Sequence, residues 1–593
     1  MGTAKIEELP IFCFFDRQRF TQFGAMDCAN FYGIKVDSGK KVQALYPAMG
    51  RKHISLFNEN KLIFNSEPRA IFKSINYMYV VDGTTVYQVD RFYNQRTMPF
   101  SVALGTPIWF ATLPVGTQVF NMLTDNEHIY VIKENGTTFT TELVTDPNAP
   151  GGADTGGKPL YVAAFGNRFV VSMANSPDFY LTQVNLAGNN NTYFTFGTPG
   201  QALQARASGI IGQFAVLHNQ LYIFCDFTTD VWSNIITQIT VGTVTTEFPW
   251  KLNTSYNFDF GIANPYSLSV DFGMMCWLAR NSNGLVSFMM SNGQSPQDIS
   301  SQAINVLLEN SDHPESVNAF LESNVYGFLY QYENTIFYRV AAGRYYNFGI
   351  LDISENAHCI EYNFETQTWG RNIELNGERN RIEKHVYFNN THIVAIQGDA
   401  ALYAMAGNIY HNETLNPEQS NHQEPDSFLK YPMRYELVTK QIFLPDYSEF
   451  MDEYVEIDFV FGNKTFYKSN APFDNTVFIV DEDSTDESPI YLVTEDDQFL
   501  ITEGSNIPQF DDNHYYALFK PHIELYYSDD GGETFLYADV REFSPLGAYR
   551  WRMRWYELGC SRNRCYKLVC VSSAPIVILG GVRNTKRVSG GAN

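Results

Sequence analysis

Short apolar arms separated by tight polar turns recur along the first 410 residues of the chain. The clearest example is Tyr77 to Val89, YMYVVDGTTVYQV, in which Asp82-Gly83 separates two arms rich in Val, Tyr and Thr. A tight hairpin turn requires residues that tolerate positive φ, and an Asp-Gly pair meets that requirement. The pattern therefore predicts a β-hairpin.

Five later segments repeat this construction, and successive hairpins begin 39 to 55 residues apart. These segments begin at His128, Asn167, Gln220, Met275 and Val325. One or two hairpins per repeat of this length are typical of the blades of a β-propeller. We therefore expect an all-β protein with a β-propeller-like domain over residues 1–425. Its irregular, aromatic N-terminal segment is expected to tie the N-terminus into the last blade through residues 20–35.

A helical pattern occurs between Ser295 and Leu321. Ile304, Leu307 and Leu308 share one face at helical spacing, and Ser300 or Ser301 is placed to cap the start. The pattern predicts a short helix packed on the sheets.

A polar, aperiodic stretch from Asn412 to Asp426 predicts a domain boundary, after which long alternating strands indicate a C-terminal antiparallel β domain over 426–593. An acidic insertion at 463–513 has two interpretations: a solvated face, or a finger that projects into a lumen or towards a partner. The small basic segment 583–593 is expected to be a mobile tail.

Three arginines alternate with apolar residues along one predicted strand of this domain. Arg550, Arg552 and Arg554 therefore lie on one face, with Trp551, Met553 and Trp555 on the other. The cationic face has the right charge to contact phosphates. The interpretation we favour is an outer sheet surface whose arginines pair with carboxylates of the same chain.

Composition supports the all-β class, because 15% of the 593 residues are aromatic and aromatic side chains favour pleated, half-buried surfaces. The net charge is −24, with 65 acidic against 41 basic residues. Binding to a phosphate backbone depends on cationic contacts, so this balance argues against a dedicated nucleic-acid binder. It is compatible with an acidic wall past which DNA slides without sticking. With no long apolar run and no secretion signal, we expect neither a membrane span nor export.

The eight cysteines are too sparse for a disulfide scaffold, which favours assembly in a reducing compartment. Cys560, Cys565 and Cys570 follow one another at five-residue intervals, wider than the usual spacing of chelating pairs, and no histidine follows them. Thiols on paired strands are favoured over zinc ligands. We predict no metal and no cofactor.

One short motif carries a specific structural signal. Ser528, Asp530, Gly532 and Thr534 fit the pattern Ser-x-Asp-x-Gly-x-Thr, which resembles the Asp-box of sialidase-type proteins. These side chains are expected to brace a hairpin turn through hydrogen bonds to the backbone. The chain contains no nucleophile elbow, zinc-protease helix or phosphate-binding loop, so we predict that it is not an enzyme.

Several segments, in the same order along most of the chain, resemble the packaged-DNA stabilisation proteins of short-tailed bacteriophages. They are QFGAMDCANFYG near the N-terminus, YMYVVDGTTVYQV, RFVVSMANSPDFYLT, QLYIFCDFTTDVW, SNGQSPQDISSQAI, YYSDDGGETF and GAYRWRMRWYELGCSRNRCYKLV. The resemblance implies a structural virion protein of the tail, assembled in the host cytoplasm. It further implies a homo-hexameric nozzle, or hub, below the head-to-tail adaptor ring, which helps to retain packaged DNA and conducts it at ejection without specific binding.

The acidic insertion departs from the shorter family pattern and leaves the shape of the distal tip open. We expect part of it to face the lumen or form the tip, and the candidate residues are Asp481, Glu482, Asp483, Glu495, Asp496 and Asp497. Tail spikes, fibres or a needle are further partners that the resemblance allows. The alternative function, suggested by the Asp-box and the abundance of Tyr and Trp, is a receptor-binding or glycan-cleaving β-propeller tail protein.

Overall fold

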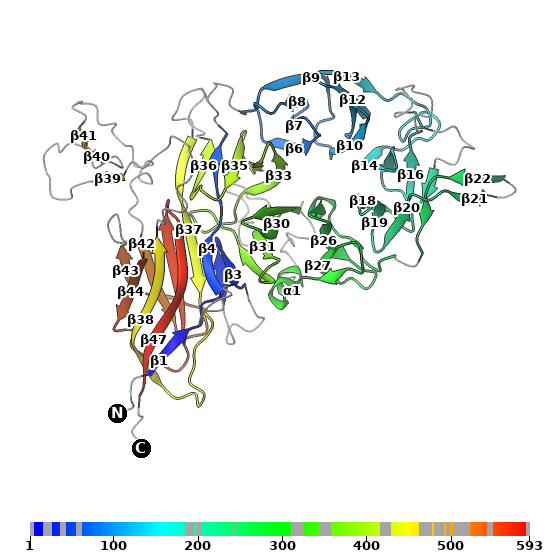
Figure 1. Ribbon diagram of the computed structural model, residues 1–593. Coiled ribbons are helices and arrows are strands. Elements are labelled where there is room, and N and C mark those ends of the chain that lie inside the picture. Colours follow the sequence, from blue (N-terminus) through cyan, green and yellow to red (C-terminus); the bar gives the residue numbers. More distant parts are fainter. Residues whose placement is uncertain are drawn as a thin grey trace.

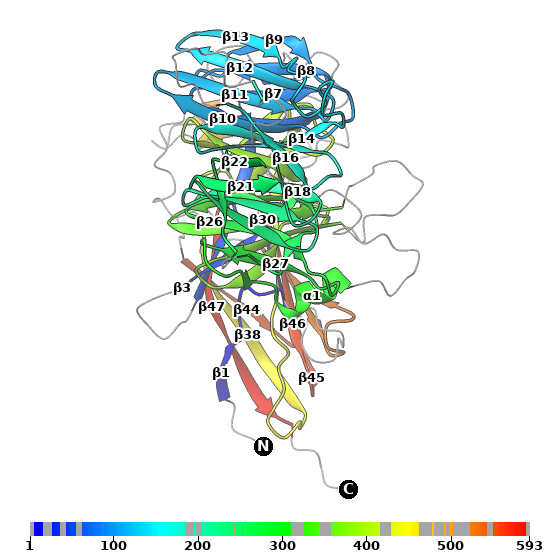
Figure 2. The same ribbon diagram turned by 90° about the vertical axis from the view of Figure 1, so that its right-hand side faces the viewer.

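The computed structural model describes residues 5–15, 26–35, 43–54, 62–183, 195–196, 204–241, 244–254, 257–309, 325–343, 357–415, 428–461, 477–479, 491–493, 499–501, 522–542 and 550–588. Strands make up most of these residues, which confirms the all-β class. Figure 1 shows a ring of small sheets beside an elongated pair of longer sheets, and Figure 2 shows the same molecule from the side.

The hairpin predicted at Tyr77 to Val89 forms the middle of the first blade. Strands β6 (Pro68–Lys73), β7 (Met78–Asp82), β8 (Thr85–Val89) and β9 (Gln95–Ser101) pair in that order, all antiparallel. Asp82 pairs with Thr85 across the turn, and Gly83 has a φ of 55°, a conformation that glycine adopts without steric cost. The local signal was therefore sufficient to place this hairpin.

Five further blades follow in chain order. Blade 2 contains β10 (Trp109–Val115), β11 (Gln118–Thr124), β12 (Ile129–Asn135) and β13 (Thr138–Leu143). Blade 3 contains β14 (Pro159–Phe165), β15 (Arg168–Met173), β16 (Asp178–Leu181) and β17 (Gln204–Arg206). Blade 4 contains β18 (Ile211–Leu217), β19 (Gln220–Cys225), β20 (Thr229–Ser233) and β23 (Lys251–Leu252).

The last two of these blades lie before the ring closes. Blade 5 contains β24 (Gly261–Ile262), β25 (Ser269–Asp271), β26 (Met274–Arg280), β27 (Val286–Ser291) and β28 (Gln297–Asp298). Blade 6 contains β29 (Tyr326–Tyr332), β30 (Thr335–Ala342), β31 (His358–Asn363) and β32 (Thr368–Arg371). A separate hairpin, β21 (Thr237–Val241) with β22 (Val244–Phe248), projects from blade 4 (Figure 1).

The seventh blade is closed by a strand from the N-terminal segment. Strands β33 (Ile382–Phe388), β34 (Thr391–Ile396) and β35 (Leu402–Ala406) are completed by β5 (Gly50–His53), which pairs antiparallel with β35. The N-terminal segment therefore does close the ring, but through residues 50–53 and not through the residues 20–35 that the sequence suggested. This pairing joins positions about 350 residues apart, for which local sequence patterns carry no signal.

Apolar side chains fill the spaces between the blades. Among the described residues, seven buried clusters each join two neighbouring blades, and one of them packs blade 7 against blade 1. The predicted helix is α1 (Gln302–Glu309), whose Ile304, Leu307 and Leu308 are buried between blades 5 and 6. The Ser301 hydroxyl accepts a hydrogen bond from the Ile304 amide at 3.3 Å, so Ser301 is the cap. The ring is thus a closed, seven-bladed propeller.

The C-terminal strands form a two-sheet sandwich beside the propeller. One sheet has the order β3 (Phe31–Lys35), β4 (Gln43–Pro47), β47 (Ile576–Arg587), β38 (Phe450–Phe461) and β44 (Arg550–Tyr556), with β1 (Lys5–Leu9) beside β47 and β45 (Cys560–Ser561) beside β38. The other contains β37 (Phe428–Val438), β46 (Cys565–Ser572), β42 (His522–Ser528) and β43 (Leu536–Glu542). Buried residues of both sheets, such as Ile457, Trp555 and Leu568, share one core.

Three expectations about the domain boundaries need correction. First, β1, β3 and β4 lie in the sandwich, so the N-terminal segment is not part of the propeller alone. Second, the supposed boundary begins as a strand, β36 (His411–Leu415), which pairs with β37. Third, 583–587 are not a mobile tail but the end of β47, where Arg583 is buried between Asp452 and Glu7.

Within the acidic insertion the structure describes three short strands, β39 (Val477–Ile479), β40 (Tyr491–Val493) and β41 (Phe499–Ile501), which form one small sheet. None of the helices in the described ranges is long and apolar enough to cross a membrane.

Candidate functional site: the junction of propeller and sandwich

The N-terminal segment from 27 to 33 lies between blade 6 and the sandwich. Strand β2 (Asp27–Ala29) pairs with β32 of blade 6 on one side and with β37 of the sandwich on the other. The Asn30 side-chain amide donates to the Ile373 carbonyl and to the Arg434 carbonyl, both at 2.7 Å. Asn30 has a φ of 58°, which asparagine tolerates better than most residues. One short segment therefore ties both parts of the molecule together.

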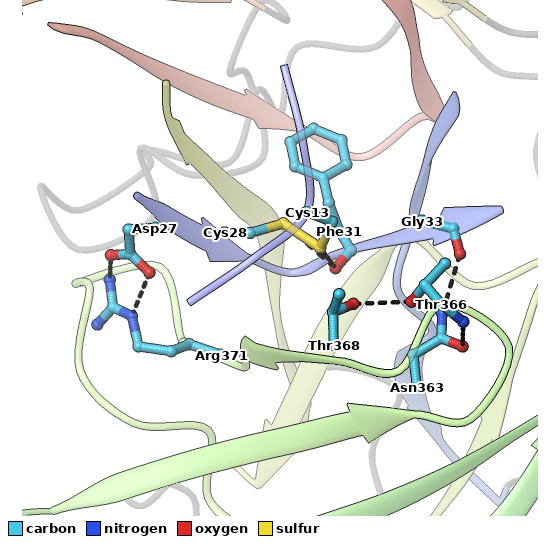
Figure 3. Close-up of a disulfide and its surroundings, with 9 residues drawn as sticks. All are labelled: Cys13, Asp27, Cys28, Phe31, Gly33, Asn363, Thr366, Thr368 and Arg371. Carbon is cyan, nitrogen blue, oxygen red and sulfur yellow. Dashed lines mark hydrogen bonds and ion pairs between the residues drawn. A yellow bond between two sulfur atoms is a disulfide. The ribbon is translucent and has the colours of Figure 1, made fainter. Parts of the chain in front are cut away.

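A disulfide lies within this segment. Cys13 and Cys28 are bonded, and their Cα atoms are 5.2 Å apart (Figure 3). This pairing could not be predicted, because the two cysteines are 15 positions apart in the sequence and the residues between them carry no pattern that brings them together. One disulfide beside six free cysteines is not a scaffold, but it departs from the thiols that a reducing compartment favours. It fixes the N-terminal segment against the strand that joins the two parts.

Ion pairs and amides extend the attachment to blade 6. The Arg371 guanidinium pairs with the Asp27 carboxylate, with an Nε–Oδ1 distance of 2.8 Å (Figure 3). The Asn363 amide donates to the Gly33 carbonyl at 2.9 Å, on the opposite side of the disulfide. Both contacts join residues more than 300 positions apart.

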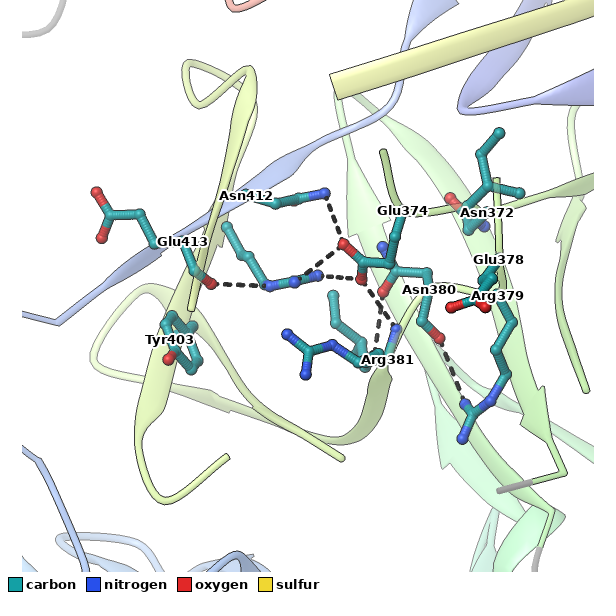
Figure 4. A network of polar contacts seen from close by, with 12 residues as sticks. Asn372, Glu374, Glu378, Arg379, Asn380, Arg381, Tyr403, Asn412 and Glu413 are labelled. Carbon is teal, nitrogen blue, oxygen red and sulfur yellow. Dashed lines mark hydrogen bonds and ion pairs between the residues drawn. The ribbon is translucent and has the colours of Figure 1, made fainter. Parts of the chain in front are cut away.

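A second polar network joins blade 7 to the strand that leads into the sandwich (Figure 4). Arg51 is fully buried, and its guanidinium contacts both oxygens of Glu374 at 2.6 and 3.0 Å. Glu374 also accepts hydrogen bonds from the Asn412 amide and from the Arg381 backbone. Burial alone would raise the pKa of Glu374, but the charges of Arg51 and Arg381 and these hydrogen bonds bring it below its ordinary value. Glu374 is therefore held as a carboxylate.

Glu413 extends this network along β36. Its carbonyl accepts from Arg51 Nε at 3.2 Å, and its carboxylate accepts from the His53 amide at 2.7 Å. Burial raises the pKa of Glu413, but His411, the His53 amide and Lys430 have the opposite and larger effect. The pKa of Glu413 therefore lies below its ordinary value. The closing strand β5 is thus held by ionised groups of the last blade and of the strand beyond it.

Blade 6 contains a third buried cluster. Arg339 is 1% exposed; its Nε lies 2.6 Å from Glu361 Oε2, and it also contacts the Tyr330 hydroxyl and the Asn372 amide oxygen. Burial disfavours the charge of Arg339, but Glu361 and Tyr330 raise its pKa above the ordinary value. The cation is therefore retained inside the blade.

The Asp-box residues form a braced turn between β42 and β43. The Gly532 amide donates to the Ser528 hydroxyl at 2.9 Å, and the Thr534 amide donates to Asp530 Oδ2 at 3.0 Å. Burial raises the pKa of Asp530, but hydrogen bonds from the Ser528 and Thr534 hydroxyls and from the Thr534 and Glu533 amides bring it below its ordinary value. Asp529 was not singled out by the motif, yet it forms a two-oxygen pair with the buried Arg564 at 2.7 and 2.8 Å.

The arginine face of β44 pairs with carboxylates of the neighbouring strand. Arg550 contacts Asp458 at 3.0 Å through Nε, and Arg554 contacts Glu456. Arg552 lies 3.7 Å from Glu456 and 3.9 Å from Asp458. This arrangement agrees with the favoured interpretation of an outer sheet surface neutralised within the chain.

The remaining predicted residues are not brought together. Cys560 is exposed at the end of β45, whereas Cys565 and Cys570 are buried in β46, all three as free thiols. The described part of the chain holds no group of three or more His, Cys, Asp or Glu residues that suits a metal ion. Asp481, Glu482, Asp483, Glu495, Asp496 and Asp497 lie outside the described residues.

The buried cations of the junction were missed, although one of them has a sequence signal. Arg339 interrupts the otherwise apolar strand TIFYRVAA, and a charge inside such a strand indicates a buried pair. Arg51 lies in the polar run GRKH, a composition that is typical of an exposed segment. Its burial depends on ring closure and cannot be inferred locally.

The comparisons with known proteins agree with this fold. The model of the phage stabilisation family described as bacteriophage P22 Gp10, beta-propeller, matches residues 68–329, which span blades 1 to 5 and the start of blade 6. No curated protein matches the chain.

Three solved structures are similar to this chain at low sequence identity. The WD40 domain of Neurospora crassa Pan2 covers 61% of this chain and 94% of its own, at 6% identity and a TM-score of 0.33. The match to the N-terminal domain of Nup159 covers 63% of this chain and 97% of that domain, at 9% identity and a TM-score of 0.29. The match to the SapL1 lectin, solved in complex with alpha methyl fucoside, covers 52% of this chain and 96% of the lectin chain, at 11% identity and a TM-score of 0.27. These scores support no functional argument.

The family match coincides with the blades and not with the sandwich, so it concerns the propeller itself. The match covers less than half of the chain, so the similarity to the phage stabilisation family is shown for blades 1 to 5 and the start of blade 6.

Proposed function

We propose that this chain is the subunit of a hexameric tail nozzle that continues the DNA channel below the head-to-tail adaptor ring. In this role the nozzle helps to retain packaged DNA and conducts it at ejection. The observation that carries the proposal is the family match over residues 68–329. The net charge of −24 supports it, because an acidic wall repels the phosphate backbone and lets DNA pass without adhering.

The junction supports the same role mechanically. A conduit under the pressure of packaged DNA needs subunits whose parts do not separate. Here the N-terminal segment is hydrogen-bonded to both blade 6 and the sandwich, and buried ion pairs hold the closing strand. These contacts bind the propeller and the sandwich into one unit.

The first test is the native mass of the purified protein over a range of concentrations, alone and with its adaptor ring. We expect a hexamer, formed either alone or on the adaptor. A monomer that ignores the adaptor at every concentration would contradict the proposal.

The lumen is tested separately. We propose that the acidic residues at 481–483 and 495–497 face the DNA channel or its tip. Changing all six to Lys is expected to slow DNA ejection, because an adhesive wall replaces a repulsive one. The control for a general change in surface charge replaces Asp539 and Glu542, on β43 of the sandwich, by Lys. Unchanged ejection kinetics in the six-residue variant would place these residues away from the DNA.

A further inference from the structure

Blade 1 carries a basic patch around its outer turn. The patch consists of Lys73 at the end of β6, Arg91 in the turn between β8 and β9, and Arg96 on the outer strand β9, all of which are exposed. None of the three forms an ion pair within the described part of the chain. Asp90, which precedes Arg91, accepts hydrogen bonds from the backbone amides of its own turn. In a chain with a net charge of −24, this patch is a local reversal of sign.

Apolar side chains lie among these cations. Phe92, Ile75 and Tyr387 are 82%, 49% and 42% exposed. The Asn389 side-chain amide donates to the Arg91 carbonyl at 3.1 Å, so the turns of blades 7 and 1 meet here. Exposed aromatic rings beside arginine are typical of protein interfaces, whereas contact with DNA phosphates requires cations alone. The composition of the patch therefore favours a protein partner.

An acidic patch lies at the corresponding end of blades 5 and 6. It consists of Asp271 at the end of β25, Asp298 on the outer strand β28 and Glu333 in the turn between β29 and β30, all of which are exposed. None of these carboxylates is paired with Lys or Arg within the described ranges. Phe272, next to Asp271, is 38% exposed, so this patch also combines charge with an apolar ring. Because antiparallel strands alternate in direction, the turns after the first and third strands of every blade lie at one end of the propeller, and both patches are at that end.

We propose that the basic patch of one copy binds the acidic patch of the next copy in the tail ring. The inference rests on the hexameric nozzle proposed above and names the surfaces that join its subunits. The patches are complementary in charge, and contact between two different surfaces of a subunit is what generates a closed ring. Around the propeller axis they are roughly a third of a turn apart, as are the two neighbours of one subunit in a six-membered ring.

The attachment of the sandwich agrees with this arrangement. The sandwich is joined to blade 6 through β2 and to blade 7 through β36, so it lies on the side of the propeller between the two patches (Figure 1). In a ring whose propeller axes run parallel to its symmetry axis, that side faces the centre. The acidic insertion, which connects β38 to β42 of the sandwich, would then be near the channel, in agreement with the lumenal position proposed for it.

The test exchanges the charges of the two patches in the full chain. The basic-patch variant combines Lys73→Glu, Arg91→Glu and Arg96→Glu, and the acidic-patch variant combines Asp271→Lys, Asp298→Lys and Glu333→Lys. Each variant alone should need at least about tenfold higher concentration than the unmodified protein to form the ring, because like charges then face each other. An equimolar mixture should restore the ring, since alternating copies again bring opposite charges together. Native mass spectrometry, with one variant labelled with ¹⁵N, should find equal numbers of the two variants in each hexamer.

The matched control changes the net charge by the same amount as the basic-patch variant, at exposed positions of blades 3 and 4. It combines Lys158→Glu, Arg206→Glu and Lys251→Glu, and it should assemble as the unmodified protein does. If a triple variant fails to fold, Arg91→Glu and Glu333→Lys, both in exposed turns, decide as single variants.

The outcomes separate this inference from the nozzle proposal. A basic-patch variant that assembles like the control, or a mixture that fails to restore the ring, overturns the inference and leaves the nozzle proposal standing. Unchanged assembly of the basic-patch variant together with lost binding of a short DNA duplex would assign the patch to DNA and likewise overturn it. An unmodified protein that stays monomeric with the adaptor ring overturns both.

Discussion

Three long cationic side chains, Arg51, Arg339 and Arg583, are at most 3% exposed and are neutralised by carboxylates from other strands. A buried ion pair is weak evidence of net stability, since desolvation offsets much of the attraction. Removal of one partner is different, because the remaining charge is left buried without compensation. These residues therefore fix which strands meet, more than they add to the total stability.

At this scale we predict the outcome of Arg339→Met. The variant leaves Glu361 inside blade 6 without its cation, so the free energy of unfolding should fall by about 3–5 kcal/mol. Arg206→Met is the control, because the Arg206 side chain is 70% exposed in its pair with Asp178, and such pairs contribute about 1 kcal/mol or less. Urea unfolding followed by fluorescence measures both. Equal losses for the two variants would show that burial of the pair does not matter.

At the scale of elements, the short strand β5 closes the propeller ring. Its four residues supply the outer strand of blade 7, and blade 7 in turn packs against blade 1. Gly50 permits the approach, since a Cβ there would lie 2.4 Å from the His411 carbonyl oxygen and 2.7 Å from that of Ile409. Both contacts are with backbone, which cannot rotate away as a side chain could.

We therefore predict that Gly50→Ala loosens the closure of the ring. Forced displacement of β5 should cost about 1–3 kcal/mol. Hydrogen exchange read by mass spectrometry should show faster exchange in peptides of β34 and β35 than in those of blade 3. Gly370→Ala is the matched control, since its Cβ would meet nothing nearer than 3.5 Å. Unchanged protection of blade 7 in the Gly50 variant would mean that β5 does not hold it.

The molecule as a whole is expected to be sensitive to acid. The pKa values of Glu374, Glu413 and Glu436 lie below their ordinary value in the folded state, because the opposing effects of cations and hydrogen bonds outweigh burial. A depressed pKa stabilises the fold at pH values above the unfolded pKa, and that contribution is lost as the pH falls through the folded pKa. Glu374 and Glu413 lie in the polar network around Arg51, and Glu436 lies on β37 opposite Ala29 of β2. Since all three residues are thus at the junction, acid should weaken the attachment between propeller and sandwich.

The corresponding prediction is that the free energy of unfolding decreases as the pH falls below the ordinary glutamate value of 4.5. Glu374→Gln should be less stable than the unmodified protein at neutral pH. Its free energy of unfolding should also change less as the pH falls below 4.5. Glu542→Gln, at the exposed edge strand β43, should leave the pH profile as it was. Thermal melts across this pH range provide the measurement. A profile in Glu374→Gln as steep as in the unmodified protein would exclude this carboxylate as a source.

The contrast between β7–β8 and β5 shows how far the sequence predicts this structure. The hairpin is local, and Asp82-Gly83 with its two apolar arms was enough to place it. Pairing of β5 with β35, or of β1 with β47, depends on residues far apart in the chain, and neither GRKH nor KIEEL carries a pattern that names its partner. Arg583 was assigned to a mobile tail because the segment 583–593 is small and basic.

The pairing of β1 with β47 also bears on the order in which the chain folds during synthesis. Strand β5 is synthesised long before its partner β35, and β1 long before its partner β47. Such distant pairings fold slowly, because the loop they close is long. The blades in between can form one after another as they appear. The sandwich, by contrast, is completed only after β47 has been made, so a chain that stops before β47 would present blades without the sheet in which β1, β38 and β47 pair.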